Sequence, residues 1–119
     1  HLDSTISDVK TLLNLAQRGC NLEYDFFGWE ISNFSLSEKD MPNDGQRLDF
    51  IEVLIKAGYG ERILIGQDMF GKHRQARFGG HGFAHIIENI IPRMRERGFS
   101  DNSIEKITIR NPARILTLE

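Results

Sequence analysis

Two short apolar runs, separated by one amphipathic helix pattern, constrain the fold of this chain most strongly. Residues 20–26 alternate between apolar and polar side chains, as a strand does, and residues 63–67 form an isoleucine-rich run of strand length. Between these runs, apolar residues recur at helical spacing until Gly58, which predicts a helix (Leu48, Ile51, Leu54 and Ile55). A strand, a crossover helix and a second strand in this order predict a parallel pair.

Further helix patterns flank this unit. An apolar stripe that ends at Gly19 predicts a helix before the first strand, and we expect Asp3 and Ser4 to cap it. After the second strand, isoleucines at helical spacing predict another helix, in which Pro92 should produce a kink. We expect Asn111-Pro112 to form a turn that breaks the chain. Parallel sheets are covered on both faces, so two strands alone indicate a piece of a larger α/β sheet or barrel.

The composition is that of an ordinary globular protein and excludes several classes. The 119 residues suffice for one modest domain, with 39% hydrophobic and 27% charged residues. The net charge of -2 predicts no binding to nucleic acid, and the apolar runs are too short for a membrane protein. The single cysteine, Cys20, cannot form an internal disulfide, so we expect a cytoplasmic protein. Because the first residue is His1 rather than Met, we expect a processed chain or part of something longer.

Asp68 is the residue that points most directly to a site. It follows the second apolar run, and a glycine-rich loop comes after it. A buried carboxylate is unfavourable unless it is paired or coordinates a metal, and the carboxyl ends of parallel strands are where chemistry usually takes place. The sequence therefore predicts that Asp68 handles a cation or a proton. A helix cap or a salt bridge to Arg74 or Arg77 is the structural alternative.

Several blocks of the chain, in their order and spacing, resemble the phosphotriesterase-related family of the amidohydrolase superfamily, and its resiniferatoxin-binding type most of all. The blocks are HLDST (1–5), LEYDFFG (22–28), RILIGQD (62–68), GGHGFAH (79–85), IIPRMRERG (90–98) and NPARIL (111–116). That family is a (β/α)8 TIM barrel, so the resemblance implies an α/β fold. Residues 1–119 would then be a single segment that forms the last third or so of the barrel, with strands seven and eight and their flanking helices.

The resemblance also implies a site with two divalent metal ions, usually zinc. His1 and Asp68 would be metal ligands, and the family's other ligands lie outside this chain. Asp68 would also be the catalytic residue that takes the proton from a metal-bridging hydroxide as the hydroxide attacks. Asp25, at the exit of the first strand, would lie behind the ligands and orient them.

By the same resemblance, the intact protein would hydrolyse an ester, lactone, amide or phosphotriester, and this segment alone would be inactive. Phe26, Trp29 and His81 are the candidate substrate-binding residues, although the aromatic residues could equally pack in the core. True phosphotriesterases have a histidine where this chain has Phe26, and an acidic relay residue where it has Ser4. Both differences argue against the activity of a true phosphotriesterase or of the related lactonases.

Two other hypotheses stay open. The chain could be a non-catalytic α/β binding module, with an anion held by the glycine-rich loop at residues 80–83. It could also be a structural half-barrel that assembles with a partner chain. In the catalytic reading, the expected partners are a small-molecule substrate and the remainder of the barrel, and a homodimer is compatible with it.

Overall fold

The sheet consists of two parallel strands, as the sequence predicts. The computed structural model describes residues 1–35 and 39–117, and in it β1 (Leu22–Tyr24) pairs with β2 (Ile63–Ile65), with Leu22 opposite Ile63 and Tyr24 opposite Ile65. The N-terminal residues run along β1, because the Leu2 amide donates to the Glu23 carbonyl at 3.1 Å. His1 is thereby brought to the carboxyl end of the sheet.

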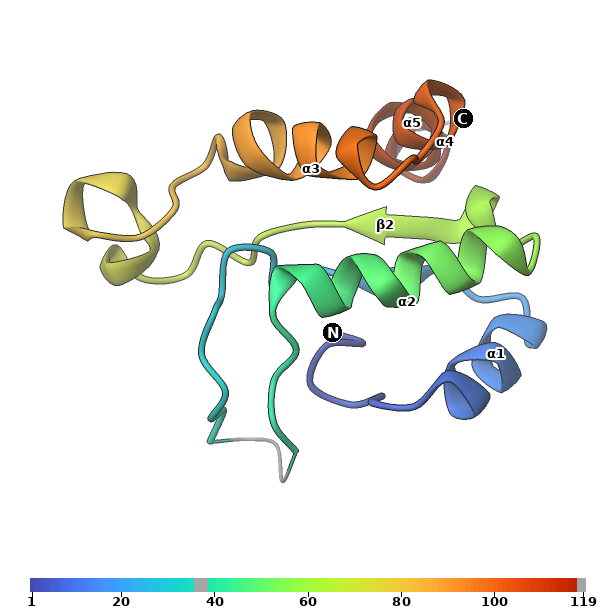
Figure 1. Ribbon diagram of the computed structural model, residues 1–119, viewed down its shortest axis with the longest axis horizontal. Helices are drawn as coiled ribbons and strands as arrows, with labels where there is room; N and C mark the ends of the chain where they lie inside the picture. Colours follow the sequence, from blue (N-terminus) through green and yellow to red (C-terminus); the bar gives the residue numbers. More distant parts are fainter. Residues whose placement is uncertain (36–38, 118–119) are drawn as a thin grey trace.

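The helices pack around these strands. They are α1 (Val9–Gln17), α2 (Asp44–Lys56), α3 (Ile91–Glu96), α4 (Asp101–Glu105) and α5 (Asn111–Leu116), with short 3-10 helices η1 (Gly60–Arg62), η2 (Lys72–Arg74) and η3 (Ala76–Phe78). In Figure 1, β2 runs between α2 and the C-terminal helices, and the chain after β2 projects away from them. Side chains of both strands and of α1 to α4 share one apolar core (Leu12, Leu22, Tyr24, Leu48, Ile51, Leu54, Ile63, Met94 and Ile104).

The cap of the first helix differs from the prediction. The N-cap of α1 is Asp8, whose side chain accepts a hydrogen bond from the Thr11 amide at 2.8 Å. Asp3 and Ser4 lie before this helix begins, so the expectation that they cap it was wrong. Asp3 is instead buried in an ion pair with Arg47, and this interaction belongs to the site described below.

Both prolines of the C-terminal half follow a wide helical turn. The π-helical turn η4 (Ile86–Ile90) precedes α3, which has Pro92 in its first turn, and η5 (Lys106–Arg110) precedes α5, which has Pro112 there. A proline lacks the amide donor and its ring crowds the preceding turn, so a wider turn allows the helix to continue. The expected break at Asn111-Pro112 was therefore wrong. Asn111 is buried, and its side-chain amide donates to the carbonyls of Gly60 at 2.9 Å and Ile63 at 2.8 Å.

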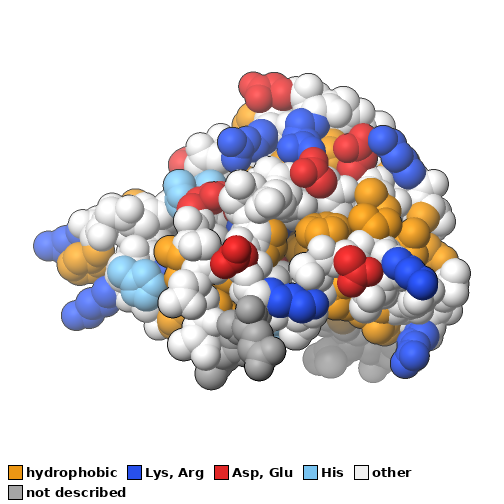
Figure 2. Space-filling model, turned by 60° about the horizontal axis from the view of Figure 1, so that its bottom comes forward, with side chains coloured by type: hydrophobic (Ala, Val, Ile, Leu, Met, Phe, Trp, Pro, Cys, Tyr) orange, Lys and Arg blue, Asp and Glu red, His pale blue; other side chains and the backbone are white. Residues whose placement is uncertain are grey.

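Apolar side chains also remain on the surface. Figure 2 shows a group of hydrophobic side chains between charged ones on the face turned to the viewer. Phe83, Ile87 and Leu116 are 71%, 70% and 77% exposed. None of the helices in residues 1–35 and 39–117 has the length and hydropathy that a membrane span needs.

Candidate metal centre

The chain changes direction sharply where β2 ends. Asp68 has a φ of 42°, and it is the only residue other than glycine with positive φ in the described part of the chain. Aspartate tolerates this left-handed conformation better than most residues, and such strain occurs preferentially at functional sites. The turn lies beside the end of β1, because the Phe27 amide donates to the Gly66 carbonyl at 3.2 Å.

Gly66 allows the two strand ends to approach closely. A β-carbon at this position would lie 3.2 Å from the Cβ of Asp25. We therefore expect Gly66→Ala to displace Asp25 and to lower the free energy of unfolding of the full-length protein by about 1–3 kcal/mol, as measured by urea denaturation. Gly60→Ala is the control, because the nearest atom to its added Cβ is Lys106 Cδ at 3.9 Å. Equal unfolding midpoints for both variants would contradict this account of Gly66.

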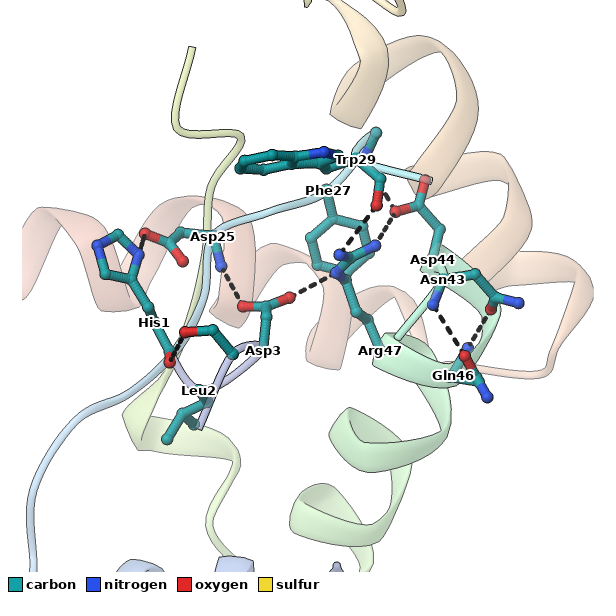
Figure 3. Close-up of polar contacts among 12 residues, drawn as sticks. His1, Leu2, Asp3, Asp25, Phe27, Trp29, Asn43, Asp44, Gln46 and Arg47 are labelled. Carbon is teal, nitrogen blue, oxygen red and sulfur yellow. Dashed lines mark hydrogen bonds and ion pairs between the residues drawn. The ribbon is translucent and has the colours of Figure 1, made fainter. Parts of the chain in front are cut away.

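Three side chains converge at the carboxyl end of the sheet. His1, Asp25 and Asp68 each offer a ligand atom, and these atoms all lie within 4.8 Å of one another. Nδ1 of His1 lies 2.6 Å from Oδ2 of Asp25. Figure 3 draws this contact. One imidazole nitrogen and two carboxylates form a donor set that suits zinc, manganese, iron or cobalt. These residues therefore fit a divalent metal ion.

Asp25 is a buried carboxylate that contacts His1 through only one of its two oxygens. Its Oδ1 is buried and has no hydrogen-bond partner among the described residues. Burial is the largest influence on this carboxyl and raises its pKa above the ordinary value, against opposing contributions that include the positive charges of Arg47 and Arg74. A buried anion with an unpaired oxygen is stabilised by a proton or by a metal ion. The position of Asp25 therefore fits a metal ligand as well as the supporting position that the sequence predicts.

The structural alternatives for Asp68 are not seen. The side chain is partly buried, and within residues 1–35 and 39–117 it forms no ion pair with Arg74 or Arg77. The short helix that follows, η2, has Gly71 at its N-cap, so Asp68 caps nothing there. The geometry leaves the cluster with His1 and Asp25 as the environment of this carboxylate.

The three residues predicted to bind substrate occupy two places. The ring of Phe26 stacks on that of His1, with centroids 5.0 Å apart and planes 6° apart, and Trp29 packs edge-on against Phe26 at 4.9 Å. Both side chains are buried. His81 lies in the loop after β2 and stacks on His85, with centroids 4.3 Å apart. Their contacts with substrate stay predictions.

A buried network of charges adjoins the cluster through Asp3, and the sequence patterns did not predict it. Arg47, on α2, is fully buried and pairs with Asp3 and with Asp44, whose Oδ1 lies 2.9 Å from its Nη1. Its Nη2 donates to the Trp29 carbonyl at 3.1 Å. A signal was present in the sequence: Arg47 stands four residues before Ile51, in the apolar stripe of its helix, where a charge requires a buried partner.

Asp44 joins this network to the loop after β2. Its Oδ2 lies 2.7 Å from Nε2 of His85, and its Oδ1 accepts from the Gly28 amide at 2.9 Å. Burial alone would raise the pKa of Asp44, but the hydrogen bonds from His85 and Gly28 and the charge of Arg47 hold it below the ordinary value. Asp44 is therefore an ionised, fully bonded carboxylate beneath the site.

Arg74, from η2, adds a second buried cation. Its Nη2 donates to the Phe27 carbonyl at 3.0 Å, and its guanidinium carbon lies 5.1 Å above the ring of Trp29. Nη1 has no partner among the described residues. Burial lowers the pKa of Arg74, and the negative charges of Asp68, Asp44 and Asp25 oppose this effect.

Comparisons with known proteins show to which family the chain belongs. A sequence model of the Phosphotriesterase family matches residues 1–116. The chain belongs to the phosphotriesterase family. It is 51% identical over 119 residues to a protein of Dictyostelium discoideum named N-acetyltaurine hydrolase, with 99% of this chain and 32% of that protein covered. A protein of Mus musculus with the same name is 48% identical over 120 residues, with 100% and 34% covered.

Solved structures of similar proteins share the fold of this chain. A resiniferatoxin-binding protein from Rhodobacter sphaeroides superposes with a TM-score of 0.83 and 33% sequence identity, over 91% of this chain and 30% of that one. The resemblance to the phosphotriesterase family is thus confirmed, as is the fold: the chain is the C-terminal part of a TIM barrel. It spans about a third of the length of the curated relatives it matches.

Proposed function

We propose that the full-length phosphotriesterase-family protein is a metal-dependent hydrolase that cleaves the amide bond of a small N-acylated substrate. The convergence of His1, Asp25 and Asp68 at the carboxyl end of the sheet carries this proposal. Relatives that match almost the whole chain are named N-acetyltaurine hydrolases, which supports hydrolysis and favours an amide. Two divalent ions, with zinc as the first candidate, would complete the site together with ligands from the rest of the barrel.

Each residue of the cluster has a distinct task in this proposal. Bound divalent ions would polarise the scissile carbonyl and make a water nucleophilic near neutral pH. His1 and Asp25 would hold an ion through a ring nitrogen and a carboxylate oxygen. Asp68 would hold an ion and accept at its carboxylate the proton that the attacking water loses. The ring of Phe26, stacked on His1, excludes water from one side of that imidazole.

The residues around the cluster favour an amide over a phosphotriester. Phe26 carries no titratable group, and Ser4 takes the place of an acidic residue, so the proton relay of true phosphotriesterases is absent from these two positions. The binding-module alternative loses support as well. The amides of Gly80 and Gly82 donate to the carbonyls of Gln75 at 3.1 Å and Arg74 at 2.9 Å, so these two donors are not free for an anion.

Arg74 suggests which end of the substrate is recognised. It is 4% exposed, and its Nη1 is unpaired in the described part of the chain, near the cluster. A buried guanidinium with a spare donor suits a carboxylate or sulfonate. The substrate we propose is therefore an N-acylated amino acid or amino sulfonate, with its anionic end toward Arg74 after a shift of the surrounding loop. N-Acetyltaurine has such a group.

A substrate panel tests the proposal. The full-length protein with zinc should hydrolyse N-acetyltaurine and N-acetylglycine at least 100-fold faster than an aryl phosphotriester. Arg74→Met should raise KM for the anionic amides about 10- to 100-fold and leave neutral N-acetylethanolamine unchanged, since a hydrogen bond to a charged group contributes about 1.5–3 kcal/mol. Arg95→Met, which removes an exposed arginine of α3, is the control. A preference for the phosphotriester, or no amide hydrolysis at all, would refute the proposed function.

A further inference from the structure

A continuous path of contacts leads from α2 to both sides of the candidate site. We propose that Arg47 is a positioning residue that orients the metal cluster through Asp3 and the substrate loop through Asp44. Each of its three donor nitrogens contacts a different part of the chain: Nε contacts Asp3, Nη1 contacts Asp44, and Nη2 contacts the carbonyl of Trp29. Figure 3 draws these contacts, with Asp3 between Arg47 and Asp25. The inference rests on the proposed function in so far as the cluster binds a metal.

The first branch of the path leads to the cluster. Asp3 accepts from Arg47 at one oxygen and from the backbone amide of Asp25 at the other, at 3.1 Å. The Asp25 side chain in turn lies 2.6 Å from His1. Because Asp3 fixes the backbone that carries Asp25, a change in Arg47 alters the direction of that carboxylate without touching it. Partners of this kind orient the ligands of metal sites.

The second branch leads to the loop after β2. Oδ1 of Asp44 accepts from Arg47, and its Oδ2 lies 2.7 Å from Nε2 of His85. The ring of His85 stacks on that of His81, the residue predicted to contact substrate. A β-carbon on Gly28 would lie 2.9 Å from Cδ2 of His85 and 3.3 Å from the Cβ of His81, so the strand exit packs tightly against both rings.

Arginine suits this task for reasons of shape and charge. Its guanidinium is planar and permanently charged, and its donors point in fixed directions, so three segments can be held in one geometry. Arg47 is fully buried and lies between two buried carboxylates, so both branches depend on the same guanidinium group. A purely structural ion pair would support the fold without directing the cluster, and the two possibilities differ in measurable ways.

The test compares two α2 variants of the full-length protein. Arg47→Met removes the contacts of Arg47 with Asp3, Asp44 and Trp29. Leu54→Ala removes a fully buried core side chain of the same helix and leaves these contacts in place. Zinc affinity is measured by competition with a chelator at a temperature where both variants are folded. We expect Arg47→Met to weaken zinc binding about 10- to 100-fold and Leu54→Ala to change it less than twofold. An equal effect of both variants would show that Arg47 only stabilises the fold.

A second variant keeps the inference testable if Arg47→Met does not fold. Asp3→Asn retains the shape of the side chain and weakens its hydrogen bond to Arg47. Like Arg47→Met, it should lower the affinity for zinc. Hydrogen exchange of the Asp25 amide in the metal-free protein gives an independent measure. Its protection should fall at least 10-fold in Asp3→Asn and stay unchanged in Leu54→Ala. Unchanged protection would overturn the inference. If the unmodified protein binds no zinc, the proposed function fails, and the amide exchange still decides whether Arg47 and Asp3 position Asp25.

Discussion

Replacing Asp68 by alanine in the full-length protein is expected to lower kcat/KM for an N-acyl amide by about 1,000-fold or more. The candidate ligand atoms of Asp68, His1 and Asp25 lie within 4.8 Å of one another, and Asp68 has a φ of 42°. In the proposed mechanism, the substitution removes both a metal ligand and the acceptor of a proton. Initial rates with N-acetyltaurine at saturating zinc provide the measurement.

The control for this prediction is an aspartate without a role in the site. Asp101, in the first turn of α4, is exposed and pairs with Arg95 on the surface, so Asp101→Ala should retain nearly full activity. Both variants should show the same circular dichroism, because Asp68 makes no ion pair in the described part of the chain that the fold could lose. An Asp68→Ala variant with more than a tenth of the original activity would contradict its catalytic role.

The second large effect concerns stability and its dependence on pH. Asp44→Asn removes the charge between Arg47 and His85, and we expect a loss of about 3–5 kcal/mol in the free energy of unfolding at pH 7, because the change breaks a buried ion pair and leaves Asp3 as the carboxylate partner of Arg47. The pKa of Asp44 is lowered in the folded protein. Its contribution to stability is therefore complete above the ordinary aspartate pKa of 3.8 and is lost as the pH falls through the lower, folded value.

Urea denaturation of the full-length protein across this pH range checks the prediction. The difference between the unmodified protein and Asp44→Asn should be largest at pH 7 and should shrink below about pH 4. Glu52→Gln is the control, since Glu52 forms an exposed pair with Lys56 on the same helix and should hardly change the unfolding midpoint. A difference that grows as the pH falls would have the wrong sign for a carboxylate with a lowered pKa.

Local sequence patterns predicted the parts of this fold that depend on neighbouring residues. Apolar periodicity identified the two strands and the helix between them, and this order predicts their parallel pairing. The carboxyl ends of the strands then placed Asp25 and Asp68 at one edge of the sheet. Resemblance to the family, rather than periodicity, brought His1 into the same site.

What the sequence did not predict depends on contacts between distant segments. Asp3 looked like a helix cap because capping is judged from nearby positions, whereas its partner Arg47 lies 44 residues away. Asn111-Pro112 looked like a turn because proline usually ends a helix, but a π-helical turn and two hydrogen bonds from the Asn111 side chain keep the helix going. Arg74 gave no local signal, since its burial depends on the fold of the loop after β2.

Metal content tests the central claim most directly. The full-length protein and its Asp68→Ala variant are purified, saturated with zinc, freed of excess metal by gel filtration and analysed by inductively coupled plasma mass spectrometry. The account predicts two divalent ions per chain in the unmodified protein and the loss of at least one in the variant. Equal metal content in the two proteins would contradict the placement of Asp68 in a metal centre, and an unmodified protein without metal would contradict the proposed chemistry as a whole.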